Sequence, residues 1–568
     1  MHLDLARIPF SRFGSYLAFS HLPADETRVA GLYLRSVRGP ATGGRPMQEI
    51  LHMQLAQNGQ PLDFTSQATF TRLSLESASG RADLCLPAPE TARIRLENVQ
   101  LRFHMPAGTY DNIIPGSAEA WQLTVNTVVE TKLQFTPLKG RVEVDAPWQA
   151  EHSEYITITL CPDPDGLGEF AIDESTVNWP EIDHSLSFDE CQRQVDDELA
   201  AFTAKLPEIP AQYAVSRQLA GYVLWSCAVA PAGHLTRPSI FASKNGMIGI
   251  WSWDHAFHSL ALANGHPDLA WAQIMAIFDQ QDESGALPDL VNDRLLSWSF
   301  CKPPVHGWIL SRLMKNSSLL TDERLREIYP RLARWTEWWF ACRDSDEDGI
   351  PQCNHGNDGG WDNSTVFAVH PPVESPEISA YLVLQMDFLA MAAARLGKPA
   401  EAAEWTSRAE ELLTRLLTHF WRGDHFVGVQ VSGHMDIESQ SLLLYLPLLL
   451  GQRLRPDIRE KLIARLKTPG EFLSPFGLAT ENLKSPMYRP RGYWRGPIWP
   501  APMIMLIDAL TQCGESEFAA DLRRSFCDLV NASGMAENFD AQTGQGYHDF
   551  HFSWTAGIFL VLANELLP

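Results

Sequence analysis

The sequence has few cysteines for its length, and they do not occur in pairs. Nine cysteines stand singly among 568 residues, with no CxxC motif and no regular spacing. A disulfide framework or a structural zinc site would require such spacing. We therefore expect reduced thiols and a cytoplasmic protein.

The chain also lacks an excess of positive charge, long apolar runs and a secretory leader. Lys and Arg number 45 against 69 Asp and Glu, a net charge of −24 that disfavours nucleic acid or a membrane as a partner. No apolar run reaches the ~18 residues needed to cross a membrane, and the first ten residues lack the basic-then-apolar layout of a secretory signal. The histidines form no HExxH motif, and His548 and His551 are expected near the site rather than as metal ligands.

Tryptophan, by contrast, is abundant. There are 18, and many of those in the second part of the chain adjoin Asp, Gly, Arg or Pro rather than aliphatic residues. An indole face can pack on the C–H side of a sugar ring, which favours a saccharide site. The alternative is that these residues are large core side chains.

Residues 1–185 are predicted to form an antiparallel β-sandwich. Apolar and polar residues alternate over 94–103, 121–125 and 156–160, a pattern typical of strands with one buried face. Breaks rich in Gly, Pro, Asn and Asp separate these stretches. A polar helical linker is predicted over 186–209. The length of the chain is enough for about two to four domains.

Residues 210–568 are predicted to be helical. Segment 405–420 repeats apolar residues at the period of an amphipathic helix, and 442–450 is apolar on every side. Thr321 is expected to cap a helix that Pro330 then breaks in two. About twelve helices fit this length, and twelve can close as two concentric rings of six whose loops converge on a funnel.

Four segments between the helical stretches concentrate aromatic and polar side chains. Because binding residues gather on loops held by a rigid scaffold, these segments are candidate active-site loops. They are WSWDHAFHS (251–259), DSDEDGIPQCNHGNDGGWDNS (344–364), YWRGPIWP (493–500) and ENFDAQTGQGYHDFHFSW (537–554).

Motifs within these loops resemble those of inverting α-glycosidases of glycoside hydrolase family 63 and its trehalase and glucoamylase-like relatives. They are Trp-Asp-x-x-Phe at 253–257, Gly-Trp-Asp-Asn-Ser at 360–364, Tyr-Trp-Arg-Gly-Pro-Ile-Trp-Pro at 493–500 and Glu-Asn-Phe-x-x-x-Thr-Gly at 537–544. The resemblance covers about residues 210–568. It implies an (α/α)6 barrel, an N-terminal β-sandwich as in the larger members, and hydrolysis of an α-linked sugar with inversion.

The resemblance assigns roles to two carboxylates: Asp362 resembles the general acid and Glu537 the general base. Inversion needs one protonated and one ionised carboxyl group roughly 6.5–9.5 Å apart, so that a water fits between base and sugar. The alternatives are that Asp362 caps a turn and that Glu537 is a solvated loop charge. Asp540 and Asp549 are further carboxylates of the same loop.

Around these two carboxylates we predict a sugar-binding pocket. Asp254 is expected to hold sugar hydroxyls, or else to cap a helix. Arg495 is expected to clamp the base or a hydroxyl through its planar fork, or else to pair with a structural carboxylate. The predicted substrate-binding residues are Trp253, Asp254, Trp361, Asn363, Trp494, Arg495, Trp499 and Trp554.

An acidic turn precedes Asp362. Asp344, Asp346 and Asp348, followed by Gly349, form the opening of a calcium-binding loop, and some family 63 members hold calcium at a similar turn. The Glu of an EF-hand is replaced by His355 at position 12, so this is not an EF-hand. A structural Ca²⁺ at the three Asp residues is one hypothesis, and a hydrogen-bonded turn or solvated loop is the other.

Together these features predict a soluble, exo-acting, inverting α-glucosidase that acts on disaccharides or short oligosaccharides and needs no cofactor for its chemistry. An α-mannoside, a glucosylglycerate-like conjugate or a trehalose-type disaccharide are alternative substrates. Two other classes are a sugar-binding protein without activity, which the intact carboxylates oppose, and a sugar phosphorylase. The latter is opposed by the lack of a basic phosphate loop near Glu537. The sequence leaves the oligomeric state open.

Overall fold

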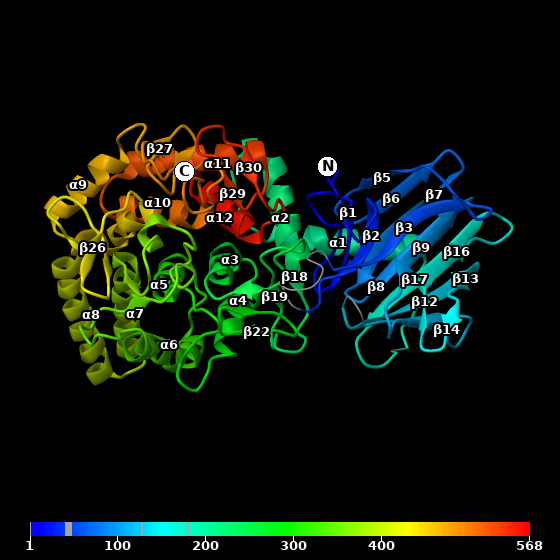
Figure 1. Cartoon of the computed structure of the whole chain (residues 1–568), viewed down its shortest axis with the longest axis horizontal. Coiled ribbons are helices and arrows are strands. Elements are labelled where there is room, and N and C mark those ends of the chain that lie inside the picture. Colours follow the sequence, from blue (N-terminus) through cyan, green and yellow to red (C-terminus); the bar gives the residue numbers. More distant parts are fainter. Residues whose placement is uncertain (1, 40–47, 127–128, 180, 568) are drawn as a thin grey trace. The chain divides into compact units, whose positions relative to one another are not determined.

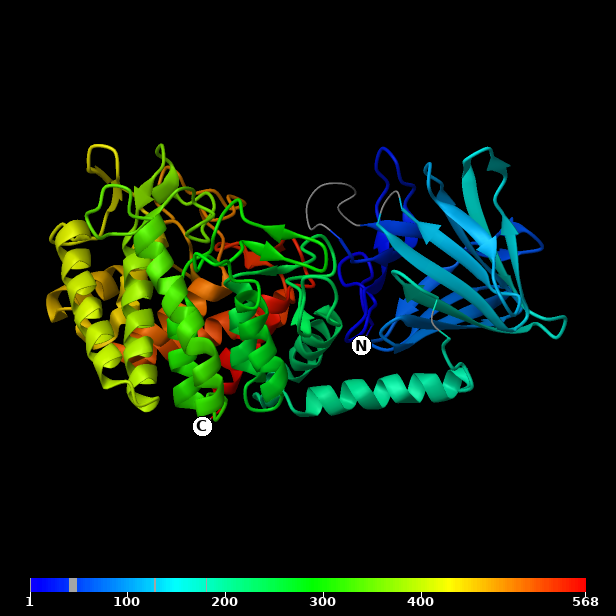
Figure 2. The ribbon, with the colours of Figure 1, turned by 90° about the horizontal axis from the view of Figure 1, so that it is seen from below.

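The computed structural model describes residues 2–39, 48–126, 129–179 and 181–567. The chain forms two compact units, one dominated by strands and one by helices (Figures 1 and 2). The first unit comprises Met1–Ala204, Tyr222–Gly249 and Asn292–Leu295, and the second comprises Lys205–Gly221, Ile250–Val291 and Leu296–Pro568.

The first unit contains two antiparallel sheets. One has the order β1-β2-β3-β9-β16-β13, with β4 paired to β3, and the other has the order β10-β11-β12-β17-β8-β7-β6-β5. The strands of the first sheet are β1 (Leu17–Leu22), β2 (Gly31–Ser36), β3 (Glu49–Gln57), β4 (Gln60–Pro61), β9 (Gln100–Pro106), β13 (Arg141–Asp145) and β16 (Tyr155–Cys161). Those of the second are β5 (Thr65–Ala68), β6 (Leu73–Ser77), β7 (Gly80–Ala88), β8 (Thr91–Glu97), β10 (Asn112–Pro115), β11 (Trp121–Val125), β12 (Thr131–Lys139) and β17 (Leu167–Ser175).

Strands such as β9 and β12 bury one face of the strand, and alternate residues of β16 are buried over much of its length, as the alternation predicts. Phe103 of β9 and Phe135 of β12 meet across the sheets with ring centroids 5.5 Å apart. The stretch 94–103 is not one strand, however. Asn98 takes a positive φ of 58° at the turn between β8 and β9, and these strands belong to different sheets. Helix α1 (Phe188–Ala204) occupies much of the predicted linker and packs on β7 and β8.

The second unit is built from helices joined by loops that carry only two- or three-residue strands. The helices are α3 (Asp254–Leu262), α4 (Pro267–Phe278), α5 (His306–Asn316), α6 (Asp322–Cys342), α7 (Pro376–Arg395), α8 (Pro399–Phe420), the 3₁₀ segment η3 (Leu442–Arg453), α9 (Pro456–Leu466), α10 (Pro500–Gln512), α11 (Ser516–Ser533) and α12 (Ser553–Asn564). Helix α2 (Ala214–Cys227) is divided between the two units. The amphipathic helix predicted over 405–420 is confirmed by α8.

Six helical segments of this unit contact one another in a closed cycle. The cycle runs α3, α5, α7, η3, α10, α12 and back to α3. Helices α4, α6, α8, α9 and α11 each pack against members of the cycle. Helices α10 and α12 of the cycle are buried on nearly every side, whereas α8 and α11 are amphipathic. The unit is a helical toroid, and the complete (α/α)6 arrangement stays a prediction.

Proline does not break α6, contrary to expectation. The helix runs without interruption from Asp322 to Cys342 with Pro330 inside it, and Thr321 caps its N-terminus by accepting a hydrogen bond from the Arg324 N–H. An interior proline costs a helix about 3 kcal/mol. Trp335 and Trp339 are fully buried in the following turns, and the burial of two such side chains outweighs that cost.

One helix of the cycle has an unusually apolar composition. Helix α7 is long and apolar enough to cross a membrane by length and composition alone, with a mean hydropathy of 1.3 over its best window. That window is 72% buried within the protein, since α7 contacts α5, α6, α8 and η3. Its apolarity is that of a core helix surrounded by other helices.

Candidate active site

Three carboxylates lie where loops of the helical unit meet regular structure. Asp254 is the first residue of α3, Asp362 precedes the short 3₁₀ helix η2 (Thr365–Phe367), and Glu537 directly precedes β29 (Asn538–Phe539). Asp254 and Glu537 are each only 5% exposed, and Asp362 is half-buried. Each of these carboxylates therefore lies at or next to a helix or strand.

A tyrosine joins the three carboxylates. The hydroxyl of Tyr493 donates a hydrogen bond of 3.1 Å to Oε1 of Glu537. The pKa of Tyr493 is raised by burial and by the nearby negative charges of Glu537, Asp362 and Asp254. Tyr493 is therefore hydrogen-bonded to one proposed proton-transfer group, Glu537, and is within electrostatic range of Asp362 and Asp254, although these residues are far apart in sequence.

Two of these carboxyl groups hold protons more tightly than usual. Burial raises the pKa of Asp254 to about 8, with Asp362 and Asp289 adding to the rise and Lys302 opposing it. Burial also raises the pKa of Glu537 to about 8; Asp549 and Asp254 add to it, and the hydrogen bond from Tyr493 opposes it. A raised pKa suits a proton donor, whereas the hydrogen bond from Tyr493 acts in the opposite direction and favours the ionised form that a base requires.

A buried lysine compensates part of this negative charge. The Nζ atom of Lys302 lies 3.3 Å from Oδ1 of Asp289 and donates to the backbone oxygen of Asn357 at 3.2 Å. Lys302 is 5% exposed, in the segment before α5. Neither Lys302 nor Asp289 lies in one of the four aromatic loops, so neither was predicted as a site residue.

Asp540, a second carboxylate of the last loop, has a separate role. Both oxygens of Asp540 are occupied: Oδ1 accepts from the backbone N–H groups of Gln542 and Thr543, and Oδ2 accepts from the Tyr547 hydroxyl. Asp540 thus stabilises its own turn, which leaves Glu537 as the carboxylate hydrogen-bonded to Tyr493.

The five tryptophans predicted to bind sugar form one continuous cluster. Trp494 stacks on Trp499 with centroids 3.9 Å apart and lies 4.7 Å from Trp361. Trp554 contacts Trp253 edge-on at 5.0 Å, and Trp499 at 6.0 Å. All five are at most 3% exposed. The near-complete burial of all five leaves little indole surface for a sugar. The cluster therefore packs the loops that carry the carboxylates against one another, and sugar stacking stays a prediction.

The amide of Asn363 fastens two of the loops together. Its Nδ2 donates to the backbone oxygen of Gly492, and its Oδ1 accepts from the backbone N–H of Trp494, both at 3.0 Å. These bonds hold the loop of Asp362 against the loop of Tyr493. Contact of Asn363 with substrate stays a prediction.

Arg495 lies close to a carboxylate outside the four loops. Burial raises the pKa of Glu481, and the positive charge of Arg495 opposes that rise. That carboxylate also accepts hydrogen bonds from Thr365 at 2.8 Å and Ser485 at 2.6 Å. Arg495 forms no ion pair among the described residues, and its Nε has no hydrogen-bond partner there. A structural ion pair and clamping of substrate or Glu537 both stay predictions.

Comparison with known proteins identifies the family. The model of the mannosylglycerate hydrolase MGH1-like glycoside hydrolase domain matches residues 247–555, just over half of the chain. The chain belongs to this family. It is therefore a glycoside hydrolase of family 63, and the matched region contains all four motif loops.

Curated relatives of this family 63 member are similar at a distance. Mannosylglycerate hydrolase MGH1 of Selaginella moellendorffii is 23% identical over 391 residues, which cover 55% of this chain and 79% of the relative. Mannosylglycerate hydrolase of Rubrobacter radiotolerans is 25% identical over 411 residues, covering 56% and 90%. Glucosylglycerate hydrolase of Mycolicibacterium hassiacum is 23% identical over 411 residues, covering 55% and 91%.

Solved structures share the fold. A family 63 mannosylglycerate hydrolase from Thermus thermophilus, in complex with Tris, matches with a TM-score of 0.52 and 21% identity, covering 60% of this chain and 98% of that one. A bacterial glucoamylase complexed with acarbose matches with a TM-score of 0.63 and 11% identity, covering 100% and 95%. The glucoamylase-like fold thus extends over both units of this family 63 chain.

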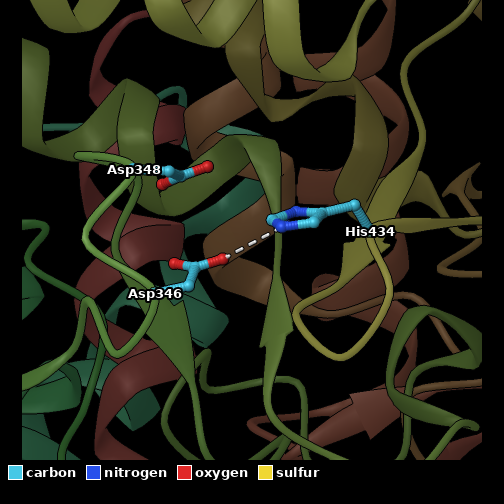
Figure 3. A group of neighbouring side chains, drawn as sticks. All are labelled: Asp346, Asp348 and His434. Atoms are coloured by element: carbon cyan, nitrogen blue, oxygen red, sulfur yellow. Dashed lines mark ion pairs between the residues drawn. The ribbon is translucent and has the colours of Figure 1, made fainter.

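The acidic turn of this family 63 member does not assemble its three Asp residues as one cluster. Asp344 accepts a hydrogen bond from the Gly349 N–H at 3.0 Å. Asp346 and Asp348 instead group with histidines: one group is Asp346, Asp348 and His434 (Figure 3), and the other is Asp348, Glu374 and His419. Calcium prefers oxygen ligands alone, so this mixed donor set fits the calcium hypothesis poorly.

Proposed function

We propose that the protein is an inverting, exo-acting hydrolase of a small α-glycoside, with Asp362 as general acid and Glu537 as general base. One observation carries this proposal. The Tyr493 hydroxyl is hydrogen-bonded to Glu537 and interacts electrostatically with Asp362 and Asp254. An (α/α)6 barrel, which the cycle of six helical contacts supports, would let loops so distant in sequence share one chamber.

Each residue has a defined step in the reaction. Asp362 gives its proton to the glycosidic oxygen as the bond from that oxygen to the anomeric carbon breaks. Glu537 takes a proton from a water whose oxygen bonds to the anomeric carbon from the opposite face. An α-glycoside and water thus yield a β-configured sugar and a free alcohol. Asp254, Lys302 and Asp289 hold the sugar and balance the charge of the chamber.

The first substrate class to test is a hexose α-linked to glycerate. This choice rests on the names of the relatives, which act on mannosylglycerate or glucosylglycerate. α-Glucosyl disaccharides are the second class, because the glucoamylase match spans the whole chain, including the sheet unit that the family model leaves out. We also propose a cytoplasmic location, which the nine unpaired cysteines support.

Proton NMR of turnover tests the mechanism and the substrate together. The full-length protein is mixed with glucosylglycerate, mannosylglycerate, maltose and trehalose in separate tubes, in buffer with and without phosphate. The expected result is release of the β-anomer first from at least one α-linked substrate, without any need for phosphate.

Each other result contradicts a specific part of the proposal. Release of the α-anomer would exclude inversion. Cleavage that requires phosphate would make the protein a phosphorylase. Binding of a sugar by calorimetry without turnover on any α-glycoside tested would favour a sugar-binding protein.

A further inference from the structure

A second cluster of ionisable side chains lies on the four-stranded sheet β23-β24-β25-β26 of the helical unit. Asp346 and Asp348 precede β23 (Gln352–Cys353), and Glu374 ends β24 (Val373–Glu374). His434 lies in the turn between β25 (Gly428–Gln430) and β26 (Met435–Ile437), and His419 in the last turn of α8. The sheet therefore gathers side chains from segments up to 88 residues apart in sequence.

Several oxygens of this cluster have no hydrogen-bond partner. Both carboxylate oxygens of Asp346 are buried without one, and Nε2 of His434 lies 3.6 Å from its Oδ2 (Figure 3). Glu374 is fully buried, and its Oε1 is likewise without a partner. Buried carboxylate oxygens are costly unless a cation or a donor satisfies them.

The ring of His419 is held as a metal-binding histidine would be. Its Nε2 donates to Oε2 of Glu374 at 2.7 Å, and its Nδ1 lies 3.7 Å from Oδ2 of Asp348. A histidine that binds a metal through one nitrogen commonly donates the other N–H to a carboxylate, which fixes the tautomer and the orientation of the ring. The hydrogen bond to Glu374 thus leaves Nδ1 as the ring nitrogen that faces Asp348.

A cavity gives solvent access to the cluster. It has a volume of about 400 Å³ and is lined in part by Asp348, His419 and His434. The two arginines on its wall form ion pairs with carboxylates outside the cluster, Arg415 with Glu411 and Arg422 with Asp436. Each also donates to a backbone oxygen of the cluster, Arg415 to that of Asp348 and Arg422 to that of His419. The cavity therefore gives a hydrated cation access to Asp348 and to the two histidines.

We propose that Asp346, Asp348, His419 and His434 bind one divalent first-row transition-metal ion, with Glu374 orienting His419. Two imidazoles beside two carboxylates favour such an ion over calcium or magnesium, whose ligands are oxygens. Ligand atoms within each group lie within 4.8 Å of one another. Metal bonds of about 2.0–2.2 Å would draw them closer together.

The ion would join three separate segments of the helical unit. It would fasten the acidic turn, whose Asp348 lies 14 residues before Asp362, to the β25–β26 turn and to the end of α8. Its role would be to stabilise the loop that holds the proposed general acid. The site itself does not depend on the proposed glycosidase activity.

Titration of the untagged, EDTA-treated full-length protein tests the site. Calorimetry with Zn²⁺ is expected to give one site per chain, with Ca²⁺ binding at least ~100-fold more weakly because of the imidazole ligands. Co²⁺ is expected to produce d–d absorption bands of a nitrogen- and oxygen-liganded site, a signal independent of activity.

Variants separate this site from incidental metal binding. His434→Ala removes a half-exposed ligand and is expected to weaken Zn²⁺ binding at least ~10-fold without loss of folding, and Glu374→Gln about 10–100-fold as the partner of a ligand. His425→Ala is the matched control, since His425 also lies between two carboxylates, Asp424 and Glu438, but belongs to no three-ligand group among the described residues. The control should bind Zn²⁺ like the wild type.

Three outcomes would overturn the proposal. The first is no Zn²⁺ binding, which would leave a protonated His419 between Glu374 and Asp348 as the function of the cluster. The second is Ca²⁺ binding as tight as Zn²⁺ binding. The third is equal Zn²⁺ affinity of the His434→Ala and His425→Ala variants.

Discussion

The hydroxyl of Tyr493 donates a 3.1 Å hydrogen bond to Oε1 of Glu537. A hydroxyl donor stabilises the ionised carboxylate and so lowers its pKa, whereas burial raises that pKa to about 8. A side chain from a different loop therefore limits the rise in the pKa of the proposed base.

Replacing Tyr493 with phenylalanine should raise the pKa of Glu537. A hydrogen bond to a charged group contributes about 1.5–3 kcal/mol, which corresponds to about one to two pKa units. A base must lose its proton before reaction, so kcat/KM rises with pH through its pKa. In Tyr493→Phe the rising limb of the pH profile should move to higher pH by at least about one unit.

The pH profile also tells which carboxylate is the base. Tyr488→Phe is the control, because the Tyr488 hydroxyl is buried without a hydrogen-bond partner among the described residues, and it should leave both limbs in place. If the falling limb moves in Tyr493→Phe instead, Glu537 is the acid and the two roles are exchanged.

Asp362→Asn should abolish most turnover while leaving the fold intact. An amide cannot donate the proton that the leaving oxygen needs, and loss of a general acid lowers kcat by at least ~10²-fold. Asp521→Asn, on the exposed surface of α11, should keep full activity. Near-normal turnover of Asp362→Asn, with circular dichroism like that of the wild type, would show that another group donates the proton.

Asn363→Ala should loosen the contact between two active-site loops. It removes the bonds to Gly492 and Trp494, each contributing about 1 kcal/mol. Thermal unfolding should begin a few degrees lower and kcat/KM should fall about 10-fold, since misplaced catalytic groups lose rate steeply. Asn363→Asp keeps the acceptor for Trp494 and should have a smaller effect on thermal unfolding. Equal effects of the two variants would mean that the bond to Trp494 contributes nothing.

Trp499→Ala should destabilise the helical unit rather than only weaken substrate binding. Trp499 is buried and stacked on Trp494, and truncation of such a side chain costs about 3–5 kcal/mol. Trp298→Ala, at a position 47% exposed, should change the free energy of unfolding by less than about 0.5 kcal/mol. Urea unfolding followed by tryptophan fluorescence measures both. A large rise in KM with unchanged stability would make Trp499 a sugar platform after all.

Local patterns in the sequence were sufficient for much of the fold. Alternation of apolar residues predicted the strand at 156–160, and a 3.6-residue period predicted α8, because both patterns follow from one buried face. The predictions failed where tertiary packing outweighed a local signal. Pro330 lies inside α6 because Trp335 and Trp339 are buried behind it.

The candidate site was only partly predictable. Motif order in the sequence singled out Asp362 and Glu537, and the structure brings both beside Tyr493. No sequence pattern pointed to Lys302 or Glu374, because a charged residue that is buried cannot be told from one on the surface by sequence alone. The tryptophans signalled the region correctly, but their mutual stacking depends on contacts between separate loops.

The sequence by itself determined that a strand-rich part is followed by a helix-rich part. It also determined the four polar aromatic loops and the two carboxylates expected to transfer protons, because local spacing and motif order are enough to find them. Only the tertiary structure decided that the Tyr493 hydroxyl bonds Glu537 and that Asp254 and Glu537 are buried. It also decided which histidines lie near Asp346 and Asp348. The physical reason is that pKa values and ligand sets depend on distance and burial in space, and chain separation carries no information about either.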